Sequence, residues 1–282
     1  MTEVNIWRHY ANSRDGQVHV LSADPKDAST PRKTPLICLH QSPMSGDVFE
    51  EFLPVIAQDR LVHCPDTPGF GGSDRPRKVV MGEKANIENF GLGLADALID
   101  LGYSEDNPVD LFGFHTGSLG AIELTRARPS LVRRIILVGI PYYPAEEREA
   151  MEKRFVTPYA FLTDPTYVPD MYARMVLNAT NDLSNEERFE AFLGRMRAGP
   201  NGQDGPDSVW SYDADEGLAA LAALKKPTLF LAFNEVLTEP HKHAHRLYFP
   251  DVPLIELSHL PMEGFKAGPQ DVADAVLPFL DG

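Results

Sequence analysis

Short apolar runs alternate with longer stretches of helical period along most of this chain. The middle runs are apolar nearly throughout, as strands covered on both faces should be. Residues 85–102 and 118–128 carry apolar side chains at spacings of three and four, which predicts crossover helices. The order predicts an α/β fold, a mostly parallel twisted sheet with helices on both faces. The expected strands are "QVHVLSA", "PLICLH", "RLVHCPD", "VDLFGF", "RRIILVGI", "PTLFLAF" and "VPLIELS".

The alternation stops after Ile140. From Pro141 to Glu216 no convincing strand occurs, and helical segments are separated by Pro- and Gly-rich joints. We therefore expect a core domain of residues 1–140 and 217–282, with a helical cap of residues 141–216 inserted after the sixth strand. Aromatic residues gather in this cap; most should pack its own core, and a few, including Tyr142, should bind an organic substrate with apolar surface. Within the cap, residues 202–208 are the segment expected to be most flexible.

Composition excludes several classes of partner. The 282 residues carry a formal charge of −15, which repels phosphate backbones and anionic lipid, so neither nucleic acid nor a membrane surface is expected. No segment approaches the roughly 18 apolar residues of a membrane span, and the first residues do not resemble a signal peptide, so a cytoplasmic protein is expected. Cys38 and Cys64 each lie in an apolar run, which favours core thiols.

The stretch "VDLFGFHTGSLG", residues 109–120, suggests chemistry most directly. An apolar strand runs into Gly-x-His-x-Gly and then into a helix. Such a sharp turn strains its corner residue, His115, so small residues are needed two positions away on each side, as Gly113 and Gly117 are. The corner side chain is expected at the carboxyl edge of the sheet, over a helix N-terminus, where ligands bind in open α/β sheets.

Four motifs in this order resemble those of the α/β-hydrolase superfamily and together cover nearly the whole chain. "LHQSPMSG" stands where the family has His-Gly-x-Pro, "DTPGFGGSD" is similar to its Asp-x-Pro-Gly-x-Gly-x-Ser turn, "GFHTG" resembles its nucleophile elbow, and "LSHLPMEG" resembles the loop of its catalytic histidine. The resemblance implies an α/β-hydrolase fold and an oxyanion hole built from the backbone N–H groups of Thr116 and Ser42, with Gln41 beside them in the "HQSP" loop. The "DTPGFGGSD" turn is expected to fix a tight loop.

The catalytic triad of that family carries over only in part. His259 matches the family's histidine and is expected in the site as a base. A gapless comparison places Val236 where the family has its acid; Glu235 is one residue earlier, and either its longer side chain reaches His259 or it is a surface-loop glutamate. At the nucleophile position, which the family fills with serine, cysteine or aspartate, this chain has His115.

Three chemical roles are open to His115. The partial positive charge of a helix N-terminus disfavours imidazolium, so a neutral ring is expected. It could attack a carbonyl to give an acyl-imidazole, act as general base on a water, or hydrogen-bond a substrate oxygen while His259 removes a proton. The second and third roles are favoured, because an N-acyl intermediate hydrolyses so readily that covalent catalysis adds little. Without chemistry, His115 would be a degenerate remnant of the elbow.

The stretch "HKHAH", residues 241–245, is the other group of histidines. His241 and His245 share one helix face at a spacing that can bind zinc. No acid or cysteine stands at matching spacing, so a solvated helix face is expected, with no metal site. No cofactor is expected either.

The leading hypothesis is an enzyme that hydrolyses a small, partly apolar ester, lactone or activated C–C bond, with His115 at the elbow and His259 as base. A lyase or cofactor-independent oxygenase that uses His259 as base is one alternative. A catalytically silent ligand-binding pseudoenzyme is the other. The expected partner is a small-molecule substrate, and a homodimer is compatible with the sequence.

Overall fold

A computed structural model of the chain describes residues 3–155, 159–179 and 184–282. Within them, eight strands form one sheet in the order β1-β2-β4-β3-β5-β6-β7-β8. β2 pairs antiparallel with β1 and β4, and all other neighbours are parallel, so the predicted fold class is confirmed. The strands are β1 (Val4–Ser13), β2 (Gly16–Pro25), β3 (Leu36–Leu39), β4 (Val62–Pro65), β5 (Val109–Phe114), β6 (Val132–Val138), β7 (Thr228–Phe233) and β8 (Leu254–Leu257).

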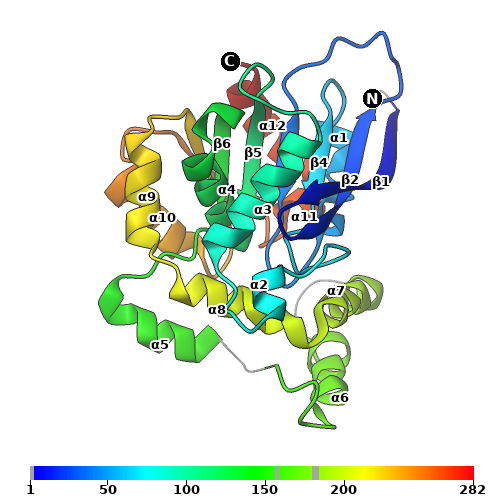
Figure 1. Cartoon of the computed structure of the whole chain (residues 1–282), viewed down its shortest axis with the longest axis vertical. Coiled ribbons are helices and arrows are strands. Elements are labelled where there is room, and N and C mark those ends of the chain that lie inside the picture. The colour runs from blue at the N-terminus through cyan, green and yellow to red at the C-terminus, as the bar shows by residue number, and fades with distance from the viewer. Residues whose placement is uncertain (1–2, 156–158, 180–183) are drawn as a thin grey trace.

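Helices cover both faces of the sheet (Figure 1). Successive residues of β5, such as Leu111 and Phe112, enter separate apolar clusters on the two faces, which explains why the central strands are apolar throughout. One cluster includes residues of α3 (Ile87–Asp100), α4 (Thr116–Ala127), α9 (Ala214–Ala223) and α10 (Thr238–Tyr248). The other includes residues of η1 (Gly46–Phe49), α1 (Leu53–Ile56), α11 (Gly264–Ala267) and α12 (Pro269–Asp281). The short α2 (Arg77–Val80) and η2 (Pro129–Leu131) lie in the connections.

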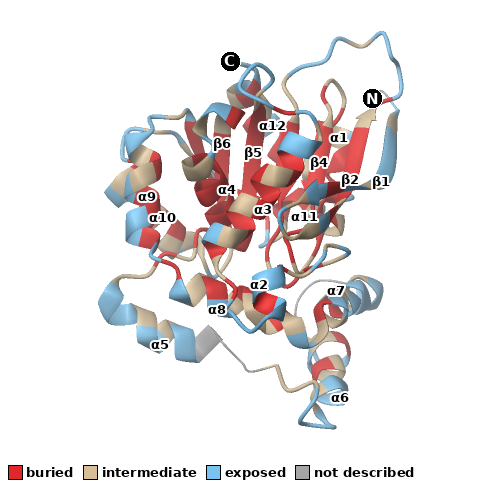
Figure 2. Ribbon diagram, viewed as in Figure 1, coloured by how far each residue is buried: buried red, intermediate tan, exposed pale blue. Residues whose placement is uncertain are grey.

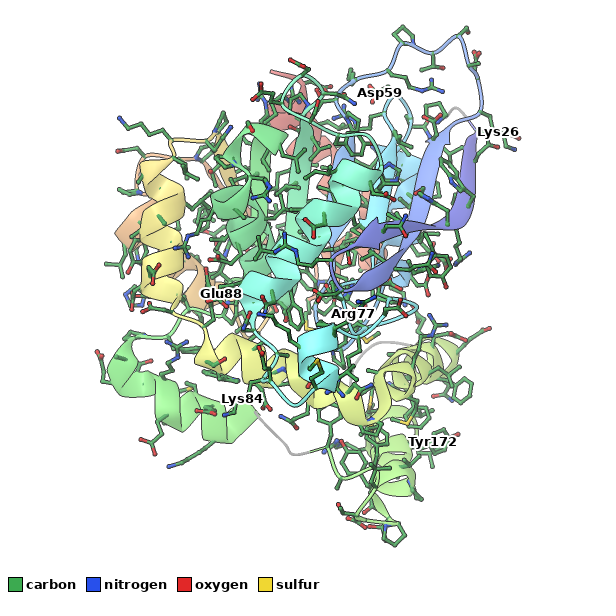
Figure 3. All side chains as sticks on the ribbon, in the orientation of Figure 1. Lys26, Asp59, Arg77, Lys84, Glu88 and Tyr172 are labelled. Atoms are coloured by element: carbon green, nitrogen blue, oxygen red, sulfur yellow. The ribbon has the colours of Figure 1, made fainter. Side chains whose placement is uncertain are left out.

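The insertion between β6 and β7 is helical in its described part, and Figure 1 shows α5 to α8 gathered below the sheet. Tyr172, labelled in Figure 3, packs with Phe189 and Phe192 in a small apolar cluster separate from the core. Residues 202–208, expected to be flexible, instead form the end of one short helix and most of another. The elements are α5 (Ala145–Phe155), α6 (Tyr167–Tyr172), η3 (Ala173–Leu177), α7 (Asn185–Ala198), η4 (Gly199–Gln203) and α8 (Asp204–Ser211).

Strand β1 was not predicted from the sequence. It forms the edge of the sheet and pairs with β2 over its whole length. Most of its residues are exposed, including Trp7 and Tyr10, so it has neither an apolar run nor a regular alternation (Figure 2). The hydropathy pattern therefore carried no strand signal there.

Two expectations from composition can be compared with the structure. Cys38 and Cys64 are both buried free thiols, as predicted. Among the helices of the described residues, none combines the length and the apolar character needed to cross a membrane.

Candidate active site

The elbow has the backbone geometry that its glycines predict. His115 lies between β5 and α4 with φ 50° and ψ −114°, a conformation that L-residues rarely adopt. A Cβ added at Gly113 would lie 2.6 Å from the carbonyl oxygen of Gly117, and one at Gly117 would lie 2.0 Å from that of Leu39. Strand, corner and helix can therefore pack this closely only with glycine at both positions.

The His115 ring is held by a buried carboxylate. Its Nε2 lies 2.7 Å from Oε2 of Glu235, which follows β7, and the two side chains are 14% and 2% exposed. The ring also stacks on Phe114, with 4.0 Å between ring centroids. Gly139, just after β6, makes room for the pair, because a Cβ there would lie 2.3 Å from His115 Cδ2 and 2.6 Å from Glu235 Oε1. Residues that follow β5 and β7 thus form the His115–Glu235 pair, and the residue that follows β6 leaves space for it.

The hydrogen bond to Glu235 fixes how the ring can act. A carboxylate only accepts, so Nε2 carries the proton and a neutral ring has its lone pair on Nδ1. The second carboxylate oxygen, Glu235 Oε1, is buried and has no hydrogen-bond partner among the described residues. The structure thus places a histidine–carboxylate pair at the corner of the elbow.

His259 lies in a different environment from the one expected. Its Nε2 is 2.7 Å from Oδ2 of Asp271 in α12, and its side chain is 61% exposed. Glu235, expected to reach His259, bonds His115 instead. The structure therefore brings together His115 and Glu235 but gives His259 a surface partner.

Another carboxyl of the same loop, Glu263, bonds the "HQSP" loop. Its Oε1 accepts a hydrogen bond from Nε2 of the buried Gln41 at 2.8 Å. Burial raises the pKa of Glu263, although Lys266, Gln41 and the charge of His115 act to lower it. Sequence reasoning missed Glu263 as a site residue; its signal was an acid four residues after His259, in a loop that the family resemblance already placed at the site.

The expected oxyanion residues lie beside the elbow. Ser42 Oγ is 2.8 Å from Thr116 Oγ1, and the Ser42 N–H donates a long hydrogen bond of 3.4 Å to the same hydroxyl. Thr116 is the first residue of α4, where backbone N–H groups have no partner within the helix. Helix α8 closes over this corner, since a Cβ at Gly205 would lie 2.3 Å from Ser42 Oγ.

Ser118 does not replace the missing nucleophile. It is fully buried, and its Oγ lies 2.7 Å from the carbonyl oxygen of Gly113 and 2.8 Å from that of Val138. The hydroxyl therefore ties α4 to the ends of β5 and β6. This supports the reading of the elbow with His115 at its corner.

Tyr142 lies in the segment that leads from β6 into the cap. Its hydroxyl donates to Asp215 Oδ1 at 2.8 Å. Its ring lines a cavity of about 420 Å³ between the start of the cap and α10, together with Val236 and His243. A second cavity, of about 330 Å³, lies between the segment after β3, α7 and α11, and its lining includes Met44, Glu190, Gly194, Glu263 and Lys266.

The three histidines of α10 point to three different surroundings. His241 is buried, its Nδ1 accepts a hydrogen bond from the Ile140 N–H at 3.2 Å, and burial lowers its pKa to about 3. His245 bonds the carbonyl oxygen of Val252, and His243 packs against Tyr142. The expectation of a solvated face is wrong for His241, because this side of α10 packs on β7. Within the described residues no cluster of His, Cys, Asp or Glu could hold a metal ion.

The "DTPGFGGSD" turn is organised around a buried aspartate. Asp66 accepts hydrogen bonds from the N–H groups of Gly46 and Gly72, at 2.6 and 2.8 Å, and from His19 Nδ1 at 2.9 Å. Burial acts to raise the pKa of Asp66, but these bonds and the charge of His40 hold it below its usual value. The residues that Asp66 bonds give it a structural role, as the motif predicts.

The corner between β5 and α4, with a buried acid after β7, two strands away in the sheet, can be compared with known proteins. The family model described as the alpha/beta hydrolase fold matches residues 34–232. The chain belongs to this family. No curated protein sequence matches it significantly.

Solved structures agree with this α/β-hydrolase assignment. A bromoperoxidase from Bacillus anthracis superposes with a TM-score of 0.76 at 18% identity, covering 98% of this chain and 100% of that one. A thermophilic esterase from Thermogutta terrifontis gives 0.72 at 18% identity, covering 97% and 98%. Naproxen esterase from Bacillus subtilis gives 0.68 at 19% identity, covering 99% and 93%. At such identities these similarities establish the α/β-hydrolase fold alone.

Proposed function

We propose that this α/β-hydrolase hydrolyses a small, partly apolar ester or lactone, or an activated C–C bond, with His115 as general base and Glu235 as its orienting acid. The observation that carries the proposal is the 2.7 Å contact between His115 Nε2 and Glu235 Oε2 at the elbow. It leaves Nδ1 of the neutral ring free to accept a proton from a water. Esterases among the structural neighbours support hydrolysis as the reaction class.

For an ester, the proposed reaction needs no protein nucleophile. Water attacks the carbonyl carbon while Nδ1 of His115 takes one of its protons, and Glu235, only 2% exposed, stabilises the imidazolium that forms. The backbone N–H groups of Thr116 and Ser42 stabilise the oxyanion. The C–O bond to the leaving group then breaks, which yields a carboxylic acid and an alcohol.

The position of His259 supports this assignment over its alternative. A lyase or oxygenase with His259 as base needs that ring at the reacting group. His259 is exposed and hydrogen-bonded to Asp271, whereas His115 has the buried acid. The proton transfer that the sequence suggested for His259 is therefore given to His115.

The test compares two histidine variants on a panel of short-chain p-nitrophenyl esters and lactones. We expect His115→Gln to lower kcat/KM by about 10²- to 10⁴-fold, the usual contribution of a general base. His259→Gln serves as the matched control and should retain wild-type activity, with circular dichroism verifying that both variants fold. Loss of activity in His259→Gln with activity retained in His115→Gln would reverse the two roles. A wild-type protein no faster than buffer would favour the ligand-binding pseudoenzyme.

A further inference from the structure

The loop after β8 contributes a carboxyl to the His115 site without contributing its histidine. Glu263 is the N-cap residue of α11 and bonds Gln41, whose neighbour Ser42 lies 2.8 Å, Oγ to Oγ1, from Thr116 beside His115. In the same loop, His259 turns to the surface and bonds Asp271. The segment that supplies the base in the related enzymes therefore supplies an acid here.

Gln41 determines which oxygen of Glu263 can carry a proton. Its Nε2 donates to Glu263 Oε1 at 2.8 Å, so a proton on the carboxyl belongs on Oε2. Gln41 is itself only 6% exposed, which fixes the pair in place. Its own Oε1 is buried without a hydrogen-bond partner in the described part of the chain, which marks an unfilled polar position beside Glu263.

Glu263 also forms part of the wall of the 330 Å³ cavity. The volume is at the lower end of the range of small-molecule sites, about 300–1,000 Å³. Met44, Val48 and Leu193 give the cavity an apolar part, and its charged part holds five carboxylates, Glu263 among them, with Arg197 and Lys266. One carboxyl thus bonds the loop that carries Ser42 and borders a space that can accept part of a small substrate.

We propose that Glu263 is the proton donor of this site and that the leaving group of the substrate lies on the side of this cavity. The inference rests on the proposed function. The two carboxyls then have separate tasks: Glu235, bonded to His115, orients the base, and Glu263, held by Gln41, protonates the leaving oxygen. An active site usually separates acid and base roles by placing two titratable groups in different surroundings.

The proton balance closes with water as the only co-reactant. His115 takes one proton from the attacking water, whose other proton stays on the carboxylic acid product. As the C–O bond breaks, its electron pair goes to the leaving oxygen, which takes the proton of Glu263. Transfer of the extra proton from His115 to Glu263 restores the starting state.

A proton donor specifies the substrate class more narrowly than hydrolysis alone. An aliphatic alkoxide is a poor leaving group and needs a proton as it departs, whereas p-nitrophenolate leaves unaided. The natural substrate is therefore an ester or lactone of an aliphatic alcohol.

The test uses two esters with the same acyl group, one of ethanol and one of p-nitrophenol. Glu263→Gln should lower kcat/KM for the ethyl ester by about 10²- to 10⁴-fold and leave the p-nitrophenyl ester unchanged. Glu256→Gln makes the same change of charge on β8, outside the site, and should leave both esters unchanged. Gln41→Met, which removes the hydrogen bond to Glu263, should show the same selective loss to a smaller degree, and it stands in if Glu263→Gln does not fold.

Two results would overturn the inference. Equal losses with both esters would assign Glu263 a structural role, and no loss with either ester would remove it from the reaction. Both results presuppose that hydrolysis depends on His115. If His115→Gln also has wild-type activity, it is the proposed function that fails, and the two failures remain distinguishable.

Discussion

Three glycines from two parts of the chain allow a bulky ring to occupy the corner of the elbow. Gly113 and Gly117 could be predicted to be small, because the motif that contains His115 requires it. Gly139 could not, because it follows the neighbouring strand β6 and its contact with His115 depends on the pairing of Phe114 with Val138. The sequence alone does not show which residues of β5 and β6 lie opposite each other.

The first prediction concerns Gly139→Ala. The added Cβ would meet His115 Cδ2 at 2.3 Å and Glu235 Oε1 at 2.6 Å, and φ at Gly139 is +62°. We expect overpacking to lower the free energy of unfolding by about 1–3 kcal/mol. Because the clash falls on both partners, hydrolysis should be lost as well, measured as kcat/KM below the unfolding temperature.

Gly102→Ala is the control for backbone strain without a clash. Gly102 also has a positive φ, +93°, but an added Cβ would meet nothing within 4 Å. This variant should lose stability and keep its activity. Wild-type activity in Gly139→Ala would show that the His115–Glu235 contact does not matter for the reaction.

The surroundings of Glu235 and Glu263 could not be predicted from the sequence either. Glu235 was expected near a histidine, but a spacing along the chain cannot say whether that histidine is His115 or His259. Glu263 was passed over because nothing in "LSHLPMEG" tells which side chains face inward. Glu263 is half-buried and His259 is exposed, and Phe265 of α11, between Glu263 and α12, packs in the core.

At the scale of elements, the strands covered on both faces could be predicted, and so could the less buried β8, whose run is largely apolar, whereas the exposed edge strand β1 could not. The runs that became β3 to β7 are buried at nearly every position, so their sequences are apolar. Strand β1 has solvent on much of its surface and gave no such signal. A hydropathy pattern reflects which residues avoid water. It therefore reveals a strand only where the residues of that strand are apolar.

Helix α8 shows how tertiary contacts override a flexible-looking sequence. Its glycine and aspartates suggest a loop, yet Gly205 allows the helix to pack on Ser42, and Asp204 pairs with Arg75 of the core through two donors, Nε at 3.0 Å and Nη2 at 2.8 Å. Ser42 and Arg75 both lie far from α8 in the sequence. Local propensity is a weak guide where such contacts decide.

At the scale of the whole molecule, buried histidines whose pKa is lowered by burial connect stability to pH; His63 and His241 are two of them, and His40 is another. Burial lowers the pKa of His63 to about 3, and His63 bonds Ser22 and Tyr103 inside the sheet region. His241, under α10, is lowered to about 3 for the same reason. In the unfolded chain both rings titrate near 6.5, so the unfolded state binds more protons between these values and the folded state loses stability as pH falls.

We therefore predict that the free energy of unfolding drops by about 2 kcal/mol per histidine between pH 7 and pH 5. Urea denaturation at the two pH values measures this drop. His63→Gln should be less stable than wild type at pH 7 but should lose less on acidification, because one of these groups is gone. An unchanged drop in the variant would mean that His63 is not kept neutral by burial.

The central claim is that His115 and Glu235 act as one unit in place of a nucleophile. A double-mutant cycle measures it most directly, with kcat/KM for an ester that the wild type hydrolyses. Glu235→Gln should lower kcat/KM in the wild-type background and have no effect in the His115→Gln background, a coupling of about 0.5–3 kcal/mol. Additive losses would contradict the account, because they would mean that the two side chains contribute independently.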